Sequence, residues 1–154
     1  MEEKIETPNF DKVNPIECVN AKLRKLQRKV ASLYDARLRP FGLEGSMLAI
    51  LFVVGKMPGI NQKTLADKLV LDPSTMSRDA KKLVKRGLIQ ATKGEDPRNT
   101  VLALTVQGYE LLEQVSPVWE AMHHKISDLF GRFSVQQLDI MTEAINQNMD
   151  ELRA

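Results

Sequence analysis

Residues 61–105 change their hydrophobic period from helical to strand-like, and this change predicts two short helices followed by a two-stranded hairpin. In residues 62–69, apolar side chains recur on one side of a helix. The second helix starts at Pro73, for which Asp72 is a good N-cap. Its predicted buried face consists of Met76, Ala80, Leu83, Val84 and Gly87. Residues 70–72 join the two helices, and helices joined in this way form a helix-turn-helix.

The period becomes two after this helix, in residues 88–92 and again in residues 100–105. The turn-rich segment 93–99 lies between these two runs, which predicts a hairpin, or wing, beside the second helix. Arg98 lies at the tip of this wing, and an Arg there is well shaped to enter a DNA minor groove.

Two helices are predicted before this centre. The first begins at Asn14, with Glu17 completing a capping box, and it ends at Pro40. The second covers residues 44–57, and its run 47–54 is apolar on every side, which is typical of the centre of a fold.

Two more helices are predicted after the wing. One covers residues 106–132, and Pro117 inside it predicts a kink or a break just before that residue. The other begins at Ser134, with Gln137 as the second half of a capping box. Its apolar stripe consists of Leu138, Met141, Ile145, Met149 and Leu152.

The fold class that follows is mainly α with a small β wing. We expect a loose N-terminal arm in residues 1–13, a winged helix-turn-helix in residues 44–105, and helical dimerisation segments in residues 14–43 and 106–154. The terminal helices have more apolar surface than a small winged domain can cover, so we expect them to pair with a second copy. The alternative is that they fold back on their own chain as a cap.

The polar face of the second helix indicates DNA binding. It carries Ser74, Thr75, Ser77, Arg78, Lys81, Lys82 and Lys85. Hydroxyls and Arg78 can meet base edges or phosphates, while Lys82 and Lys85 can neutralise the DNA backbone. Helix-turn-helix units with solvated lysines also occur in proteins that bind no nucleic acid. A protein–protein adaptor therefore stays open as an alternative.

At this point the chain resembles the multiple-antibiotic-resistance regulator (MarR) family of winged helix-turn-helix repressors. The matching residues are Asp96-x-Arg98, Leu104-Thr105, Gly108 and Leu111-Leu112, preceded by Ser74-Thr75-x-Ser77-Arg78. The resemblance implies a homodimer on a pseudo-palindromic operator. It also implies Ser74, Thr75, Ser77 and Arg78 in the major groove, Arg98 in the minor groove, and Asp96 steadying that Arg. Asp79 departs from the pattern, and an acidic residue there is expected to narrow which bases are read.

Composition and motif content indicate where the protein is located and which kinds of chemistry are not expected of it. The 154 residues carry a net charge of only +2, but basic residues gather in the first predicted helix and acidic residues after residue 106. Neither a membrane span nor a secretory signal is apparent, so the expected location is cytoplasmic. We find no catalytic triad, phosphate loop or metal-ligand spacing, and we expect no enzyme, no metal and no cofactor.

Regulation is expected from a small-molecule effector that relieves repression. The resemblance implies a ligand pocket where the long helices meet the winged domain, and the residues that could line it are Tyr34, Phe41, Met47, Trp119, Met122 and His123. The same side chains could simply fill core. The alternative regulator is oxidation of Cys18, the single cysteine, which the predicted helix start and nearby lysines would favour as a thiolate; a plain packing role is open too.

Overall fold

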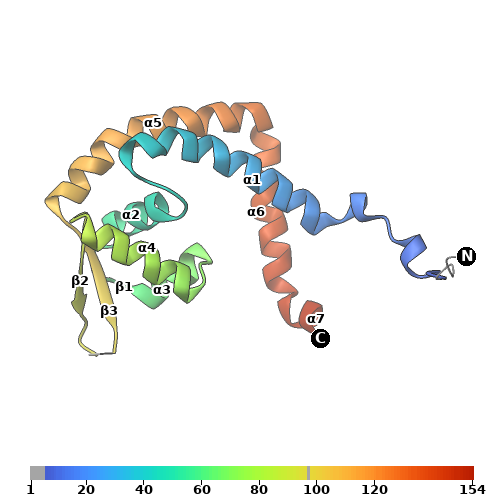
Figure 1. The fold of residues 1–154 in the computed structure, drawn as a ribbon, viewed down its shortest axis with the longest axis horizontal. Helices are drawn as coiled ribbons and strands as arrows, with labels where there is room; N and C mark the ends of the chain where they lie inside the picture. Colours follow the sequence, from blue (N-terminus) through green and yellow to red (C-terminus); the bar gives the residue numbers. More distant parts are fainter. Residues whose placement is uncertain (1–5, 97) are drawn as a thin grey trace, which may run out of the picture.

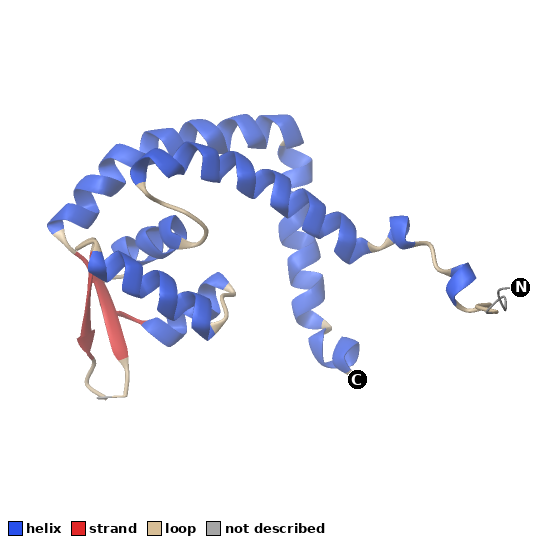
Figure 2. Cartoon of the chain, viewed as in Figure 1, coloured by secondary structure: helices blue, strands red, loops and turns tan. Residues whose placement is uncertain are grey.

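In the computed structural model, which describes residues 6–96 and 98–154, most of the chain is helical and a small sheet lies at one end of the molecule (Figure 1, Figure 2). The helices are α1 (Val19–Leu38), α2 (Met47–Lys56), α3 (Gln62–Leu69), α4 (Pro73–Lys85), α5 (Val106–Phe130), α6 (Arg132–Gln147) and α7 (Met149–Arg153). The strands are β1 (Ile60–Asn61), β2 (Ile89–Lys93) and β3 (Thr100–Leu104), and three 3-10 turns are η1 (Phe10–Lys12), η2 (Pro15–Glu17) and η3 (Arg39–Phe41). The predicted fold class is confirmed.

Helix α2 forms the centre of the core, as its apolar sequence predicts. Ile50, Leu51 and Val54 are fully buried, and α3, α4, α5 and β3 all pack around them. The helix begins at Met47 and not at Glu44, because Gly45 has a φ of 56°, a left-handed conformation that an α-helix excludes.

The helix-turn-helix is confirmed. Asn61 caps α3 by accepting hydrogen bonds from the backbone N–H groups of the first turn, and Asp72 caps α4 by accepting the N–H of Thr75 at 2.9 Å. Between the helices, Val70 is left-handed, with a φ of 51°. The two caps and the turn are thus made by residues that lie directly beside the ends of α3 and α4.

The hairpin is also confirmed, with its strands within a residue of the prediction. The sequence did not predict β1, which pairs antiparallel with β3 and gives the strand order β1-β3-β2. Two residues are too few to show a period of two. Figure 1 shows the β2–β3 wing extending away from the helices.

The first long helix begins later than predicted. Asn14 does accept a hydrogen bond from the N–H of Ile16, but it closes only the 3-10 turn η2, and extended backbone at Cys18 separates that turn from α1. Ile16 is exposed, so no tertiary packing extends the helix through this segment. Of the predicted arm, residues 1–5 lie outside the described residues.

Helix α5 runs beside α1 along one edge of the molecule (Figure 1). It is not broken at Pro117, and its ribbon curves around the winged domain. The predicted cap at Ser134 is wrong: Gly131, with a φ of 75°, ends α5, and α6 starts directly after it. The last helix is also interrupted at Asn148, so Met149 and Leu152 belong to the separate α7.

A large apolar surface lies on the terminal segments. Exposed apolar side chains on the N-terminal side are Phe10, Val13, Ile16, Val19, Leu23, Leu26 and Leu33, and those on α5, α6 and α7 are Leu129, Phe133, Leu138, Ile140, Met141, Ile145 and Leu152. This part of the molecule lies at the end opposite the wing (Figure 1). Of the helices described, none combines the length and apolar character that crossing a bilayer requires.

Candidate nucleic-acid interface

Helix α4 presents a cationic face to solvent. Met76, Ala80 and Leu83 point into the core, so the polar residues between them, with the exception of Asp79, point outward. The outward side chains line a shallow hollow of about 520 Å³, and they are Ser74, Ser77, Arg78, Lys81, Lys82 and Lys85. Hydroxyl, guanidinium and ammonium groups together suit a polyanionic partner.

The start of α4 is fixed by its cap. The hydroxyl of Ser74 and the N–H of Thr75 both donate to Oδ1 of Asp72. These hydrogen bonds, Ser74 first, hold the pKa of Asp72 far below its usual value. Ser74 therefore has a local role in the cap besides its place on the outward face, and Thr75 is half-buried.

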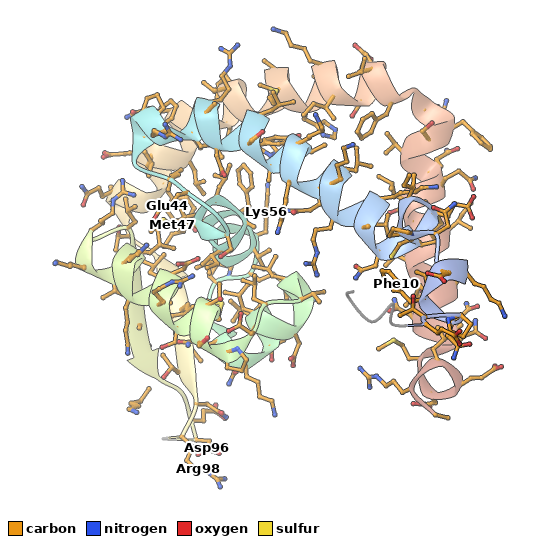
Figure 3. All side chains as sticks on the ribbon, turned by 45° about the vertical axis from the view of Figure 1, so that its right-hand side comes forward. Phe10, Glu44, Met47, Lys56, Asp96 and Arg98 are labelled. Carbon is orange, nitrogen blue, oxygen red and sulfur yellow. The ribbon has the colours of Figure 1, made fainter. Side chains whose placement is uncertain are left out.

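Arg98 lies at the tip of the wing (Figure 3), where 89% of its side chain is exposed. Asp96 accepts hydrogen bonds from the backbone N–H of Arg98 at 3.0 Å, from Nε at 3.2 Å and from Nη2 at 3.0 Å. The guanidinium in turn lowers the pKa of Asp96. The carboxylate holds the Arg98 side chain in one orientation while its outer edge faces solvent.

Two hollows join α4 to the wing. One, of about 490 Å³, has Lys81 and Lys85 of α4 on one side and Ala91 and Thr100 of the strands on the other. The second, of about 460 Å³, lies between α3, the start of α4 and Arg98. The helix and the wing thus present one continuous surface.

Several polar residues of this surface were absent from the predicted contacts. Gln62 and Lys63, at the start of α3, and Asn99, beside Arg98, line the hollow next to the wing. The cap residue Asn61 fixes where α3 begins, and that local signal could have pointed to Gln62 and Lys63. Lys81 was placed on the polar face of α4 but was not predicted as a contact.

Two predictions about α4 are wrong. Asp79 does not face outward, because it is only 5% exposed and accepts hydrogen bonds from the Ser46 hydroxyl at 2.5 Å and from Arg78 Nε at 3.5 Å. It cannot touch bases from that position. Val84, predicted to be buried, is exposed and lines the hollow between α4 and the strands.

The six predicted pocket residues lie in different surroundings. Met47 is 2% exposed within the core, and Tyr34, Phe41 and Trp119 pack against that core. His123 is stacked on Trp119, with ring centroids 5.0 Å apart and planes 3° apart. Met122 lines a separate hollow of about 310 Å³ between α1 and α5.

Cys18 is exposed and sits at the N-cap of α1, with no hydrogen bond from its side chain to the helix. It therefore precedes the first turn in which the sequence placed it, and its redox role stays a prediction. Within residues 6–96 and 98–154, no three His, Cys, Asp or Glu side chains are grouped so that they could hold a metal ion.

A helix-turn-helix followed by a two-stranded wing, with a cationic second helix, defines a winged helix-turn-helix protein. Residues 45–100 match the model of the MarR family. This match shows that residues 45–100 carry a domain of the MarR family of transcriptional regulators, in agreement with the resemblance in the sequence. It is a family of regulators and not of enzymes.

Two curated relatives illustrate the similarity. The chain is 34% identical over 118 residues to the HTH-type transcriptional regulator Hpr of Halalkalibacterium halodurans, covering 71% of this chain and 62% of Hpr. It is 30% identical over 92 residues to the HTH-type transcriptional regulator SarZ of Staphylococcus saprophyticus, covering 59% of this chain and 63% of SarZ. The chain thus spans less than two thirds of the length of either relative.

Solved structures show the same fold at lower identity. The M. tuberculosis transcriptional regulator MOSR, crystallised in complex with DNA, superposes with a TM-score of 0.75 at 24% identity, over 90% of this chain and all of MOSR (100%). The PcaV regulator of Streptomyces coelicolor, crystallised with its natural ligand, superposes with a TM-score of 0.71 at 20% identity, over 90% of this chain and 96% of PcaV.

Proposed function

We propose that this chain is a sequence-specific double-stranded DNA-binding repressor that acts as a homodimer on a pseudo-palindromic operator. The observation that carries the proposal is the continuous surface formed by the cationic face of α4 and the Arg98 wing, both fixed to one core. That MOSR, a protein of the same fold, was crystallised with DNA supports this choice of partner. Such a role would place the protein in the cytoplasm.

In the proposed complex, α4 enters the major groove. Ser74, Thr75, Ser77 and Arg78 would contact base edges or phosphates there. Lys82 and Lys85 would contact phosphates that flank the groove. Arg98, held by Asp96, would enter the adjacent minor groove, where the negative potential is deepest.

The dimer is proposed from the exposed apolar side chains of residues 10–33 and of residues 129–152. If the terminal helices were a cap on their own chain, these side chains would be buried within it, and they are not. Exposed apolar side chains gathered in such number on two terminal segments are typical of a protein–protein interface. A two-fold dimer would present its two α4 helices to successive turns of the duplex.

Relief of repression is proposed to come from a small molecule bound near Trp119 and His123, between the long helices and the winged domain. These two rings are stacked with parallel planes, and they offer a flat face to an aromatic ligand. The crystal structure of PcaV with its natural ligand supports an effector for this fold. The other side chains proposed to line the pocket of this small molecule are Tyr34, Phe41, Met47 and Met122.

Arg98→Ala is the test of the DNA interface. We expect it to weaken binding to a duplex selected from genomic fragments by about 1–3 kcal/mol, because the minor-groove contact is lost while the exposed side chain contributes little to folding. Fluorescence anisotropy at several salt concentrations measures the affinity, and circular dichroism checks that the variant is folded.

Lys125→Ala, which removes one positive charge from α5 far from the wing, is the matched control and should keep nearly full affinity. Equal affinities of Arg98→Ala and wild type would remove the wing from the mechanism. Wild-type protein that shows no salt-dependent binding to any duplex would support the adaptor alternative instead.

A further inference from the structure

The segment between α1 and α2, residues 39–46, lies along the recognition helix α4. We name it the connector. It contacts Asp79 and Lys82 on one face of α4, and Arg86, the C-cap of that helix; the three residues follow one another at helical spacing. The connector runs antiparallel to α4, so its last residues meet the middle of that helix and its first residues meet the end.

Both ends of the connector are fixed by hydrogen bonds. The guanidinium of Arg86 donates to the backbone carbonyls of Gly42 at 2.5 Å and Phe41 at 2.8 Å. At the other end, the hydroxyl of Ser46 donates to the buried carboxylate of Asp79 at 2.5 Å. A side chain between these two anchors is therefore held in a defined position over α4.

Glu44 is that side chain. Its Oε1 lies 2.7 Å from Nζ of Lys82, one of the cations on the outward face of α4. The hydrogen bond and charge of Lys82 lower the pKa of Glu44, so the carboxylate is ionised at neutral pH. Both side chains are substantially exposed, and Figure 3 labels Glu44 close to Met47, the first residue of α2.

We propose that Glu44 is an internal competitor that occupies Lys82 in place of a DNA phosphate and lowers the sequence-independent part of DNA binding. This inference rests on the proposed function. A carboxylate and a phosphate both present anionic oxygens to an ammonium group, so the two compete for Lys82. Any duplex must displace Glu44 before Lys82 can contact its backbone.

The consequence concerns the part of the affinity for DNA that does not depend on base sequence. Phosphate contacts contribute affinity that is independent of base sequence, whereas base contacts discriminate between sequences. An internal competitor at a phosphate contact lowers the affinity for every duplex, and only a sequence that also satisfies the base-reading residues binds tightly. Glu44 thus lowers the affinity for operator and bulk DNA by the same factor, so that tight binding requires the base contacts that an operator supplies.

The experiment compares wild type, Glu44→Gln, Lys82→Ala and the double variant on a fluorescein-labelled, mixed-sequence duplex of about three helical turns. Glu44→Gln should bind this duplex about twofold to fivefold more tightly, the range expected when one exposed ion pair no longer competes. The freed Lys82 should steepen the slope of log affinity against log salt by about 0.9, one phosphate contact. Thermal melting checks that each variant is folded.

Glu113→Gln, which removes an equal charge from an exposed site on α5, is the matched control and should bind less tightly than Glu44→Gln. In the Lys82→Ala background, Glu44→Gln should give no gain. An equal gain with and without Lys82, or no gain at all, would overturn the inference while leaving the proposed function intact. Wild-type protein that binds no duplex would overturn both.

Discussion

Val70 has an unfavourable backbone conformation, in the turn between the two helices of the helix-turn-helix. Among the residues that the structure describes, it is the one non-glycine residue with a positive φ, and its branched Cβ makes that conformation costly. The side chain is 90% exposed, so burial offsets little of the cost. We expect Val70→Gly to raise the free energy of unfolding by about 1 kcal/mol, measured by urea denaturation at fixed protein concentration.

The same substitution at Val84 is the control. Val84 is also partly exposed, but it lies inside α4 with helical backbone, where glycine costs about 1 kcal/mol relative to a helix-forming residue. Val84→Gly should therefore destabilise the protein. If Val70→Gly lowered stability as well, strain at Val70 would be excluded as a significant term. Val70→Asn, which tolerates the left-handed region without adding freedom to the unfolded chain, separates the two effects.

At the scale of elements, the corner between β3 and α5 depends on one glycine. A Cβ built on Gly108 would lie 2.1 Å from the carbonyl oxygen of Leu88, which is backbone and cannot rotate away. Thr105 closes the same corner, because its hydroxyl donates to the carbonyl of Gly87 and accepts the N–H of Gly108. Close packing against the Leu88 carbonyl thus explains why a glycine stands at this position of the family signature.

Gly108→Ala should destabilise the protein by about 1–3 kcal/mol, because the wing and α5 must separate to admit the methyl group. Urea denaturation followed by circular dichroism measures the change. Gln107→Ala, one residue earlier and exposed, introduces the same side chain without the clash and should be nearly neutral. Equal midpoints for the two variants would mean that the corner adjusts at no cost.

The elements that the sequence predicts well are those whose ends are set by neighbouring residues. The helix pair follows from Asp72, Pro73 and the apolar period, all of which are local. The start of α1 and the start of α6 were misplaced. Asn14 and Ser134 have capping side chains, but the extended backbone of Cys18 and the positive φ of Gly131 set where these helices begin. Strand β1 exists only through its pairing with β3, some forty residues later.

At the scale of the molecule, the same distinction applies to the candidate site. Helical spacing predicts that Arg78 and Lys85 face outward and that Met76 is buried, and the structure agrees. It does not predict the partners of Asp79 and Lys82, because Ser46 and Glu44 lie 33 and 38 residues earlier in the chain. A sequence period describes one helix, whereas these contacts depend on which segment packs over it.

The association of two copies gives the last prediction. Phe133 is 73% exposed near the start of α6, within the apolar surface proposed as the dimer interface. A carboxylate at its position would have to be buried without a partner in the dimer, which is strongly unfavourable, whereas in a monomer it would be hydrated. Phe133→Asp should therefore shift the mass measured by light scattering from two chains toward one, and weaken binding to a pseudo-palindromic duplex, because one α4 grips only one half-site.

Val106→Asp is the matched control for this substitution. Val106 is equally exposed, but it lies at the first turn of α5 beside the wing, at the other end of the molecule from α6 (Figure 1). An acidic residue in a first helical turn is also favourable to the helix, so this variant should fold and keep the mass of wild type. Wild-type protein that scatters as a single chain would contradict the dimer, and equal masses for Phe133→Asp and wild type would move the interface away from α6.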